Sequence, residues 1–200
     1  MPTPDDGGLW GVLGGTFDPV HRGHLSLATE LLRECRLDGV LFVPAFNHPQ
    51  KKKRATAPLE DRLTMLELAV GEEDRFLIDR IEISEKLSGY SLDTVRALKQ
   101  TYPEATFAFL VGQDNLSQLS HWHSSEQLLA EVQFIAGARP GNSAADSKHV
   151  SQVKLVSTVL VEISSTQVRK CVANGASDSE LDQLVPQSVR EYIRHRGLYQ

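Results

Sequence analysis

The sequence predicts an α/β protein in three layers, with a mainly parallel sheet between helices and a small helical part at the C-terminus. Short apolar runs such as Gly39 to Pro44 are typical of strands that are covered on both faces, as in parallel sheets. They alternate with amphipathic segments such as Leu59 to Val70, whose apolar residues recur at helical spacing. A strand, a helix and a strand follow one another within about 35 residues near the start, the length of one βαβ unit.

Each element is expected from its own local pattern, in chain order. The expected strands are Leu9 to Gly15, Gly39 to Pro44, Arg75 to Asp79, Ile81 to Ile83, Thr106 to Val111, Val132 to Ala138 and Val153 to Val161. The expected helices are Leu25 to Cys35, Leu59 to Val70, Leu92 to Thr101 with Ser91 as N-cap, Leu116 to Ala130 with a break around Ser120 to Ser124, and Ser188 to Arg196 ending at Gly197.

Length and composition limit the class of protein. A chain of 200 residues fits a single domain, with residues 163–200 as its helical C-terminal part and Met1 to Gly8 as a flexible leader. The net charge of −5 argues against broad binding of nucleic acid, which depends on Lys and Arg. Cys35 and Cys171 have no metal-ligand spacing, and neither a secretory signal nor a membrane span is visible. We expect a soluble, cytoplasmic protein, and a homo-oligomer remains open.

The stretch from Leu9 to Leu25 has the pattern of a phosphate-binding site. Gly14 and Gly15 end the first strand, and glycines let a backbone approach a ligand closely. The free N–H groups at the start of the next helix favour negative charge. His21 and His24 lie in that first helical turn, where two imidazoles are able to stabilise charge on a reacting phosphate.

Three later segments add candidate groups. Gly112 and Asp114 follow a buried strand, where open α/β sheets hold ligands. Trp122 either packs against the core or stacks on a flat aromatic ligand. The segment from Ser164 to Arg169 is either a capping box, with Ser164 and Gln167, or a second anion cradle facing the first.

These motifs together resemble a known family. Gly14 to His24 matches the nucleotidyltransferase signature with its His-x-Gly-His pair, and Ile163 to Arg169 resembles the second motif of that superfamily. The stretches Gly89 to Thr94, Val111 to Trp122, Ala138 to Gly141 and Val185 to Tyr199 narrow the resemblance to bacterial nicotinate-nucleotide adenylyltransferase. The resemblance runs from about residue 9 to the C-terminus and implies a Rossmann-like three-layer fold.

The resemblance also implies a reaction and a set of roles. The 5′-phosphate of nicotinate mononucleotide would attack the α-phosphate of ATP, giving deamido-NAD and pyrophosphate, with Mg²⁺ held by the ATP phosphates and by no protein ligand. His21 and His24 would be catalytic. The implied ATP-binding residues are Gly14, Gly15, Thr16, Phe17, His21, His24, Gly112, Asp114, Ser165, Thr166 and Arg169. The implied mononucleotide-binding residues are His48, Lys51, Tyr90, Ser91 and Trp122, with Trp122 stacked on the pyridine ring.

The sequence departs from the family pattern at two places. After the second strand, the family often has Pro-Pro-His-Lys, whereas this chain reads Asn47-His48-Pro49-Gln50-Lys51. Without a gap, Gln50 takes the histidine position and Lys51 keeps the lysine; with a shift, His48 supplies the imidazole. His123 also stands after Trp122 where a tyrosine is common.

Other functions are open to the same sequence. Within the class, nicotinamide mononucleotide or phosphopantetheine is an alternative substrate. A non-catalytic nucleotide-binding regulator on the same fold is a second alternative. A zinc hydrolase would use His21 and His24 with Asp18 or His121, although the sequence lacks a His-Glu-x-x-His pattern.

Overall fold

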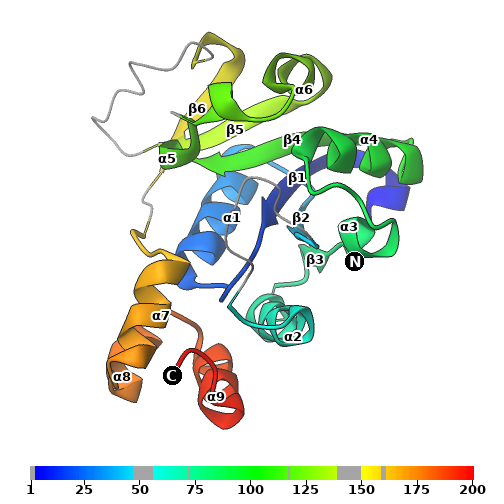
Figure 1. Cartoon of the computed structure of the whole chain (residues 1–200). Coiled ribbons are helices and arrows are strands. Elements are labelled where there is room, and N and C mark those ends of the chain that lie inside the picture. Colours follow the sequence, from blue (N-terminus) through cyan, green and yellow to red (C-terminus); the bar gives the residue numbers. More distant parts are fainter. Residues whose placement is uncertain (1–2, 47–55, 72, 117, 139–149, 159–160) are drawn as a thin grey trace.

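The computed structural model describes residues 3–46, 56–71, 73–116, 118–138, 150–158 and 161–200 (Figure 1). Its centre is a six-stranded sheet in the order β3-β2-β1-β4-β5-β6, with every neighbouring pair parallel. The strands are β1 (Gly8–Gly15), β2 (Gly39–Pro44), β3 (Phe76–Ile78), β4 (Ala105–Gly112), β5 (Gln133–Ala138) and β6 (Val153–Ser157). The chain builds one half of the sheet outward from β1 and then crosses to β4, so the topological switch point lies between β1 and β4. The predicted Rossmann-like α/β fold is confirmed.

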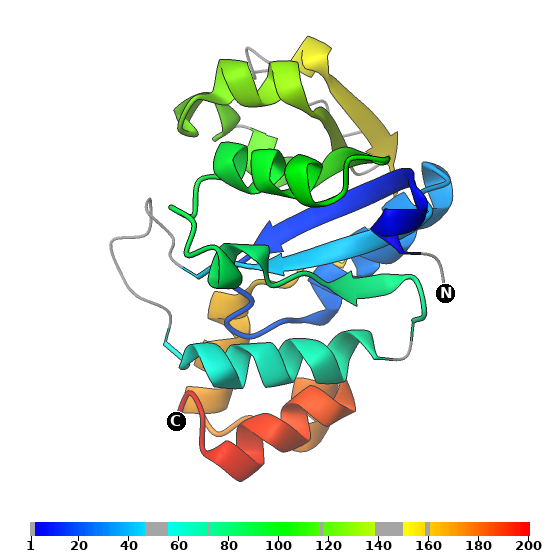
Figure 2. The same ribbon diagram turned by 90° about the vertical axis from the view of Figure 1, so that its right-hand side faces the viewer.

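Helices cover both faces of the sheet (Figure 2). One face carries α1 (Arg22–Glu34), α2 (Leu59–Val70) and the C-terminal α7 (Ser165–Ala173), α8 (Asp178–Asp182) and α9 (Gln187–Arg196). The other carries α3 (Ile81–Ser84), α4 (Ser91–Thr101), α5 (Gln113–Leu116) and α6 (Ser125–Glu131). Short 3-10 turns lie at Pro4–Asp6, Leu119–His121 and Val150–Gln152. No helix of the described residues is long and apolar enough to span a membrane.

The sheet separates two apolar cores. Leu13, Leu31 and Met65 belong to the core beneath α1 and α2, while Trp10 and Val95 belong to the core on the α4 side. All six residues of β2 are buried, as expected of a strand covered on both faces. The C-terminal helices and the turn between α8 and α9 join the first core through buried residues, namely Val168, Val172, Leu181, Val185, Val189 and Ile193.

Some boundaries differ from the prediction. The expected strand Ile81 to Ile83 is wrong: Asp79 Oδ1 accepts the Ile81 N–H at 2.9 Å and the chain turns into α3. The last strand ends at Ser157 rather than Val161. At α4, the N-cap is Tyr90, so Ser91 is the first helical residue and not the cap.

Two expected features of helices near the site can be compared with the structure. The helix expected from Leu25 starts three residues earlier, at Arg22, which makes His21 its N-cap. The expected break after α5 is present, because a 3-10 turn separates α5 from α6.

At the N-terminus, the segment expected as a flexible leader instead contains the 3-10 turn Pro4–Asp6, and Gly8 already belongs to β1.

Candidate active site

The first motif lies at the carboxyl end of the sheet, beside the switch point. β1 ends at Gly15, and the chain then turns through Thr16 to Val20 before α1 begins at Arg22. Gly14 is exposed and Gly15 is half-buried, so this backbone is accessible. Phe17 is 2% exposed and its ring packs against Phe42. The ring of Phe17 is therefore part of the core, and only its main chain is placed to line a ligand.

The two histidines form a stacked pair at the start of α1. Their ring centroids are 3.6 Å apart with an interplanar angle of 23°. The His21 N–H donates to His24 Nδ1 at 3.2 Å, so a neutral His24 carries its proton on Nε2. The edge of Phe17 meets His24 at 5.1 Å between centroids and supports that ring.

The histidines differ in solvent exposure and charge. His21 is 5% exposed, whereas His24 is partly exposed. Burial lowers the pKa of His21 to about 4. His21 is thus a neutral imidazole near pH 7, and any positive charge that it carries during a reaction must be stabilised by a bound anion.

Two buried charged residues hold the loop between β1 and α1. Arg62 of α2 donates through Nη1 to the carbonyl oxygens of Thr16 at 2.6 Å and Ala45 at 3.2 Å. Burial lowers the pKa of Arg62, and the nearby Asp18 carboxylate opposes that shift. Asp18 itself accepts the amides of Thr56 at 2.7 Å and Ala57 at 3.0 Å. The loop is therefore fixed from the ends of both β1 and β2.

The second motif makes direct contact with the first. Ser164 Oγ accepts the Gln167 N–H at 3.1 Å, so the capping interpretation holds for Ser164. Ser165, the first residue of α7, donates its hydroxyl to the carbonyl oxygen of Pro19 at 2.9 Å. Arg169 donates to the carbonyl oxygen of Asp18 at 2.6 Å and to Thr166 Oγ1 at 3.1 Å. The two motifs are thus joined by hydrogen bonds. Ser164 caps α7, and this role is compatible with an anion-binding site at the start of the same helix.

Gly112 ends β4, next to β1 in the sheet. Among the described residues, a Cβ atom built on Gly112 meets no atom within 4 Å, so none of their contacts requires glycine at this position. Asp114 follows two residues later as the second residue of α5, which starts directly after β4. A glycine that the fold does not need, at the switch point, is what close approach of a ligand would require.

The expected mononucleotide residues lie on the α4 side of the sheet. Tyr90 and Ser91 start α4, and the Tyr90 ring stacks on His123 with centroids 4.1 Å apart. This contact brings the start of α4 to the segment that holds Trp122. The Trp122 ring is partly buried and meets Phe109 and Phe134 edge-on, so core packing accounts for part of it. The expected residues His48 and Lys51 lie outside the described residues.

Sequence reasoning did not assign three residues that the structure places at the site. From the sequence, Asp18 has a role only as a zinc ligand, and Tyr199 and Arg62 have no role in the site. Tyr199 donates its hydroxyl to Asp18 Oδ1 at 2.9 Å across the whole length of the chain. The one available signal for Arg62 was its helical spacing, three residues after Leu59 and four before Leu66, which places it beside the apolar face. No local sequence pattern indicates the role of Tyr199, because its hydrogen-bond partner, Asp18, is 181 residues away.

A protein-bound metal centre has little support at this position. Among the described residues, no group of three or more His, Cys, Asp or Glu side chains is placed to hold a metal ion. The stacked rings of His21 and His24 lie face to face, so their nitrogens do not converge on one point. Both Asp18 oxygens accept hydrogen bonds from protein donors. This arrangement does not fit the zinc hydrolase alternative.

The fold and the two linked motifs define a class of α/β nucleotidyltransferases. The family model described as Cytidylyltransferase-like matches residues 12–171, which include both motifs. A relative from Exiguobacterium sibiricum, named "Probable nicotinate-nucleotide adenylyltransferase", is 40% identical over 189 residues, covering 94% of this chain and 97% of the relative. A relative of the same name from Geobacillus kaustophilus is 38% identical, covering 96% of this chain and 86% of that protein. The chain belongs to the nicotinate-nucleotide adenylyltransferase family within the cytidylyltransferase-like proteins.

Solved structures agree on the fold. Plasmodium falciparum nicotinic acid mononucleotide adenylyltransferase complexed with NaAD superposes with a TM-score of 0.80 at 19% identity, covering 96% of this chain and 97% of that chain. The same enzyme complexed with APC gives a TM-score of 0.78 at 18% identity, with the same coverage. This likeness extends the fold assignment over nearly the whole chain.

Proposed function

We propose that this protein transfers the adenylyl group of ATP to nicotinate mononucleotide, giving deamido-NAD and pyrophosphate in NAD biosynthesis. The observation that carries the proposal is the direct hydrogen bonding between the two motifs at the switch point: Ser165 to Pro19 and Arg169 to Asp18. These bonds place the histidine pair and the start of α7 around one end of the sheet. The names of the relatives at about 40% identity support the same reaction.

The chemistry needs positioning and charge stabilisation rather than a protein nucleophile. An oxygen of the mononucleotide 5′-phosphate attacks the α-phosphorus of ATP in line, and the bond from that phosphorus to the bridging oxygen of pyrophosphate breaks. A phosphate monoester loses its second proton with a pKa of about 6, so the attacking oxygen is already ionised near neutral pH. No general base and no covalent intermediate are required.

Each side of the site has a role in this scheme. His24, with its proton on Nε2, and the neutral His21 donate hydrogen bonds to the phosphate oxygens that gain charge. Thr166, Arg169 and the N-terminal amides of α7 hold the β- and γ-phosphates, because a helix start favours anions. Gly14, Gly15, Thr16 and the main chain of Phe17 line the nucleotide, with Gly112 and Asp114 on the ribose side.

The mononucleotide lies toward α4 in this proposal. The amides at Tyr90 and Ser91 would read the nicotinate carboxylate, since N–H donors suit a carboxylate and do not suit an amide NH₂ group. Trp122 would stack on the pyridine ring through the part that the core leaves exposed. His48 or Lys51 would contact the phosphate of the mononucleotide.

Mg²⁺ is the proposed cofactor, carried on the ATP phosphates and neutralising their charge. The protein groups nearest to those phosphates are donors and a cation rather than carboxylates, a set that fits a metal held by its substrate. We propose that the reaction takes place in the cytoplasm. Removal of Mg²⁺ with a chelator should abolish product formation and excess Mg²⁺ should restore it.

Steady-state rates with competing acceptors test the proposal. Purified protein is supplied with ATP, Mg²⁺ and either nicotinate mononucleotide, nicotinamide mononucleotide or phosphopantetheine, and dinucleotide product and pyrophosphate are measured. We expect the highest kcat/KM with the nicotinate form. A higher kcat/KM with the amide or with phosphopantetheine would contradict the substrate assignment, and ATP binding without turnover of any acceptor would favour a regulator.

A further inference from the structure

The carboxylate of Asp18 is buried and engaged by neutral donors. It is 6% exposed. Its Oδ2 accepts the Thr56 amide at 2.7 Å, and its Oδ1 accepts the Ala57 amide at 3.0 Å and the Tyr199 hydroxyl at 2.9 Å. A buried carboxylate needs such donors, because an unsatisfied charge is costly away from water. The lone pairs of Asp18 are therefore used by two amides and one hydroxyl.

Arg169 approaches the same carboxylate without a hydrogen bond to it. Arg169 Nη1 donates to the Asp18 carbonyl oxygen at 2.6 Å, whereas its distance to Asp18 Oδ2 is 3.8 Å. That separation is within ion-pair range but longer than a hydrogen bond. The Arg169 side chain is 28% exposed. Its charge is thus held near the carboxylate while part of the Arg169 side chain faces solvent.

Tyr199 reaches Asp18 through an unusual backbone path. After α9, Gly197 has φ 60° and Tyr199 has φ 66°. A non-glycine residue in the left-handed region costs about 1 kcal/mol and persists where surrounding contacts require it. The Tyr199 ring packs on the first core, and burial together with the Asp18 carboxylate raises the pKa of its phenol. The hydroxyl consequently stays a proton donor.

We propose that Tyr199 is a positioning residue for adenylyl transfer, whose hydroxyl occupies Asp18 Oδ1 and so leaves the charge of Arg169 available to the phosphates of ATP. Without that hydroxyl, Oδ1 keeps only the Ala57 amide and the Asp18 carboxylate loses one of its three donors. The guanidinium of Arg169 is a charged donor already 3.8 Å from Oδ2 of the same carboxylate. A direct charge-assisted bond would form between them. Arg169 would then be turned away from the polyphosphate. The inference rests on the proposed function, because it concerns ATP at that site.

Tyr199→Phe is the direct test, since it removes the hydroxyl and keeps the ring that packs on the core. Tyr192→Phe is a matched control, because Tyr192 of α9 likewise donates to a buried carboxylate, Asp61 Oδ1, at 2.8 Å. For Tyr199→Phe, we expect the KM for ATP and the Kd of MgATP to rise about tenfold, the size of one hydrogen bond to a charged group. The KM for nicotinate mononucleotide should change less than twofold, and Tyr192→Phe should leave all of these constants at their wild-type values.

A double-mutant cycle separates positioning from a general structural role. In an Arg169→Gln background, Tyr199→Phe should weaken MgATP no further, because the group through which it acts is absent. The inference would be overturned if Tyr199→Phe raised the MgATP Kd by the same factor in the wild-type and the Arg169→Gln backgrounds. The same MgATP Kd in Tyr199→Phe and Tyr192→Phe would also overturn it. Binding is measured by calorimetry below the melting temperature of every variant, so a loss of stability does not enter the comparison.

The same measurements keep the two proposals apart. If the wild-type protein binds MgATP but does not adenylylate nicotinate mononucleotide, the proposed function fails while the MgATP cycle still decides the role of Tyr199. If the wild-type protein transfers adenylyl groups and the cycle is additive, the proposed function stands and the role of Tyr199 is refuted.

Discussion

At the scale of single residues, the histidine pair divides into a buried and a partly exposed member. His21 is held under the loop as the N-cap of α1, whereas His24 accepts the main-chain N–H of His21 and rests against Phe17. The stacking at 3.6 Å makes simultaneous protonation of both rings unfavourable unless an anion is bound. The pair is therefore suited to donate hydrogen bonds to a phosphate rather than to act as an acid and a base.

His24→Ala tests this role in catalysis. Loss of a donor that stabilises developing charge lowers kcat by about 10²-fold or more, while the remaining phosphate contacts keep ATP bound. We expect that fall in kcat and a change in MgATP Kd of less than about threefold, measured by steady-state kinetics and calorimetry. His195→Ala, which removes an exposed imidazole from α9, is the control. A His24→Ala enzyme with wild-type kcat would exclude His24 from the chemistry.

The buried His21 should make folding stability depend on pH. Burial lowers the pKa of His21 from 6.5 to about 4, so between these values the unfolded chain binds a proton that the folded chain does not. Stability contributed by the neutral ring is complete above pH 6.5 and is lost as the pH falls toward 4. The total is roughly 3 kcal/mol at most.

Urea unfolding at a series of pH values measures this contribution. The wild-type free energy of unfolding should decrease from pH 6.5 to pH 4, and His21→Asn should show a shallower decrease over the same range. His195→Asn is the matched control, because it removes an exposed histidine. Identical slopes for wild type and His21→Asn would refute the buried neutral state of His21.

At the scale of elements, the ends of β1 and β4 bring the first motif and Gly112 to one edge of the sheet. Glycines on these two strands serve different purposes. A Cβ on Gly11 would come within 2.6 Å of Leu110 Cδ1 and 2.9 Å of Leu37 Cδ1, so Gly11 is required by packing. A Cβ on Gly112 has no such neighbour within 4 Å in the part of the chain that the structure describes. The comparison separates a glycine that packing requires from one that, in the proposed function, leaves space for the nucleotide.

Gly112→Ala and Gly11→Ala form a matched pair for this distinction. In Gly112→Ala, the methyl group meets no atom of the described residues within 4 Å, so the melting temperature should be unchanged. The MgATP Kd should rise about tenfold or more, because the methyl group takes space from the nucleotide. Gly11→Ala should lower the free energy of unfolding by about 1–3 kcal/mol through overpacking. Thermal melts and calorimetry check both. Unchanged MgATP affinity in Gly112→Ala would remove this position from the nucleotide site.

Elements whose apolar pattern covers six or more residues could be predicted, whereas patterns of three to five residues predicted β3 correctly and Ile81 to Ile83 wrongly. β2 and α2 have apolar patterns that depend only on their own residues, and both were located within their observed bounds. The three residues Ile81 to Ile83 alternate like a strand, but the side chain of Asp79 starts a helical turn there. Periodicity over three residues carries too little information to compete with one side-chain hydrogen bond to the main chain.

The candidate site also shows what local sequence patterns are able to predict and what they are not. Gly14 to His24 and Ser164 to Arg169 are continuous stretches whose residue types indicate phosphate chemistry without a structure. Arg62 and Tyr199 act through single contacts with Thr16 and Asp18 that depend on how distant helices pack. Such contacts have no local pattern in the sequence. For that reason, candidate binding groups could be proposed from the sequence, whereas the groups that hold them in place could not.

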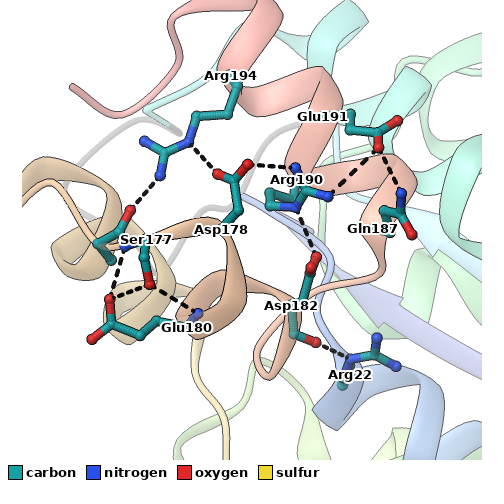
Figure 3. A network of polar contacts seen from close by, with 10 residues as sticks. Arg22, Ser177, Asp178, Glu180, Asp182, Gln187, Arg190, Glu191 and Arg194 are labelled. Carbon is teal, nitrogen blue, oxygen red and sulfur yellow. Dashed lines mark hydrogen bonds and ion pairs between the residues drawn. The ribbon is translucent and has the colours of Figure 1, made fainter.

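At the scale of the whole molecule, the C-terminal helices complete the first motif from outside the sheet. Arg22, the first residue of α1, donates its amide to the Leu184 carbonyl oxygen at 2.8 Å and its Nε to that of Asp182 at 2.7 Å. The first N–H groups of a helix lack partners within it, so these carbonyls satisfy a donor that α1 cannot. Arg190 in turn binds Asp182 at 2.7 Å and Asp178 at 2.9 Å, which ties α8 to α9 (Figure 3).

Arg190→Met should therefore loosen the first motif from a distance. With α8 less firmly held, the Leu184 carbonyl leaves the Arg22 amide more often, and amide hydrogen exchange in a peptide covering residues 20–25 should become faster. Peptides from α4, on the other face of the sheet, should exchange as in the wild type. Arg33→Met is the control, since its ion pairs with Glu30 and Glu34 stay on α1. If Arg190→Met changed exchange equally in α4 and residues 20–25, its effect would be global destabilisation, and the C-terminal helices would not specifically support the phosphate site.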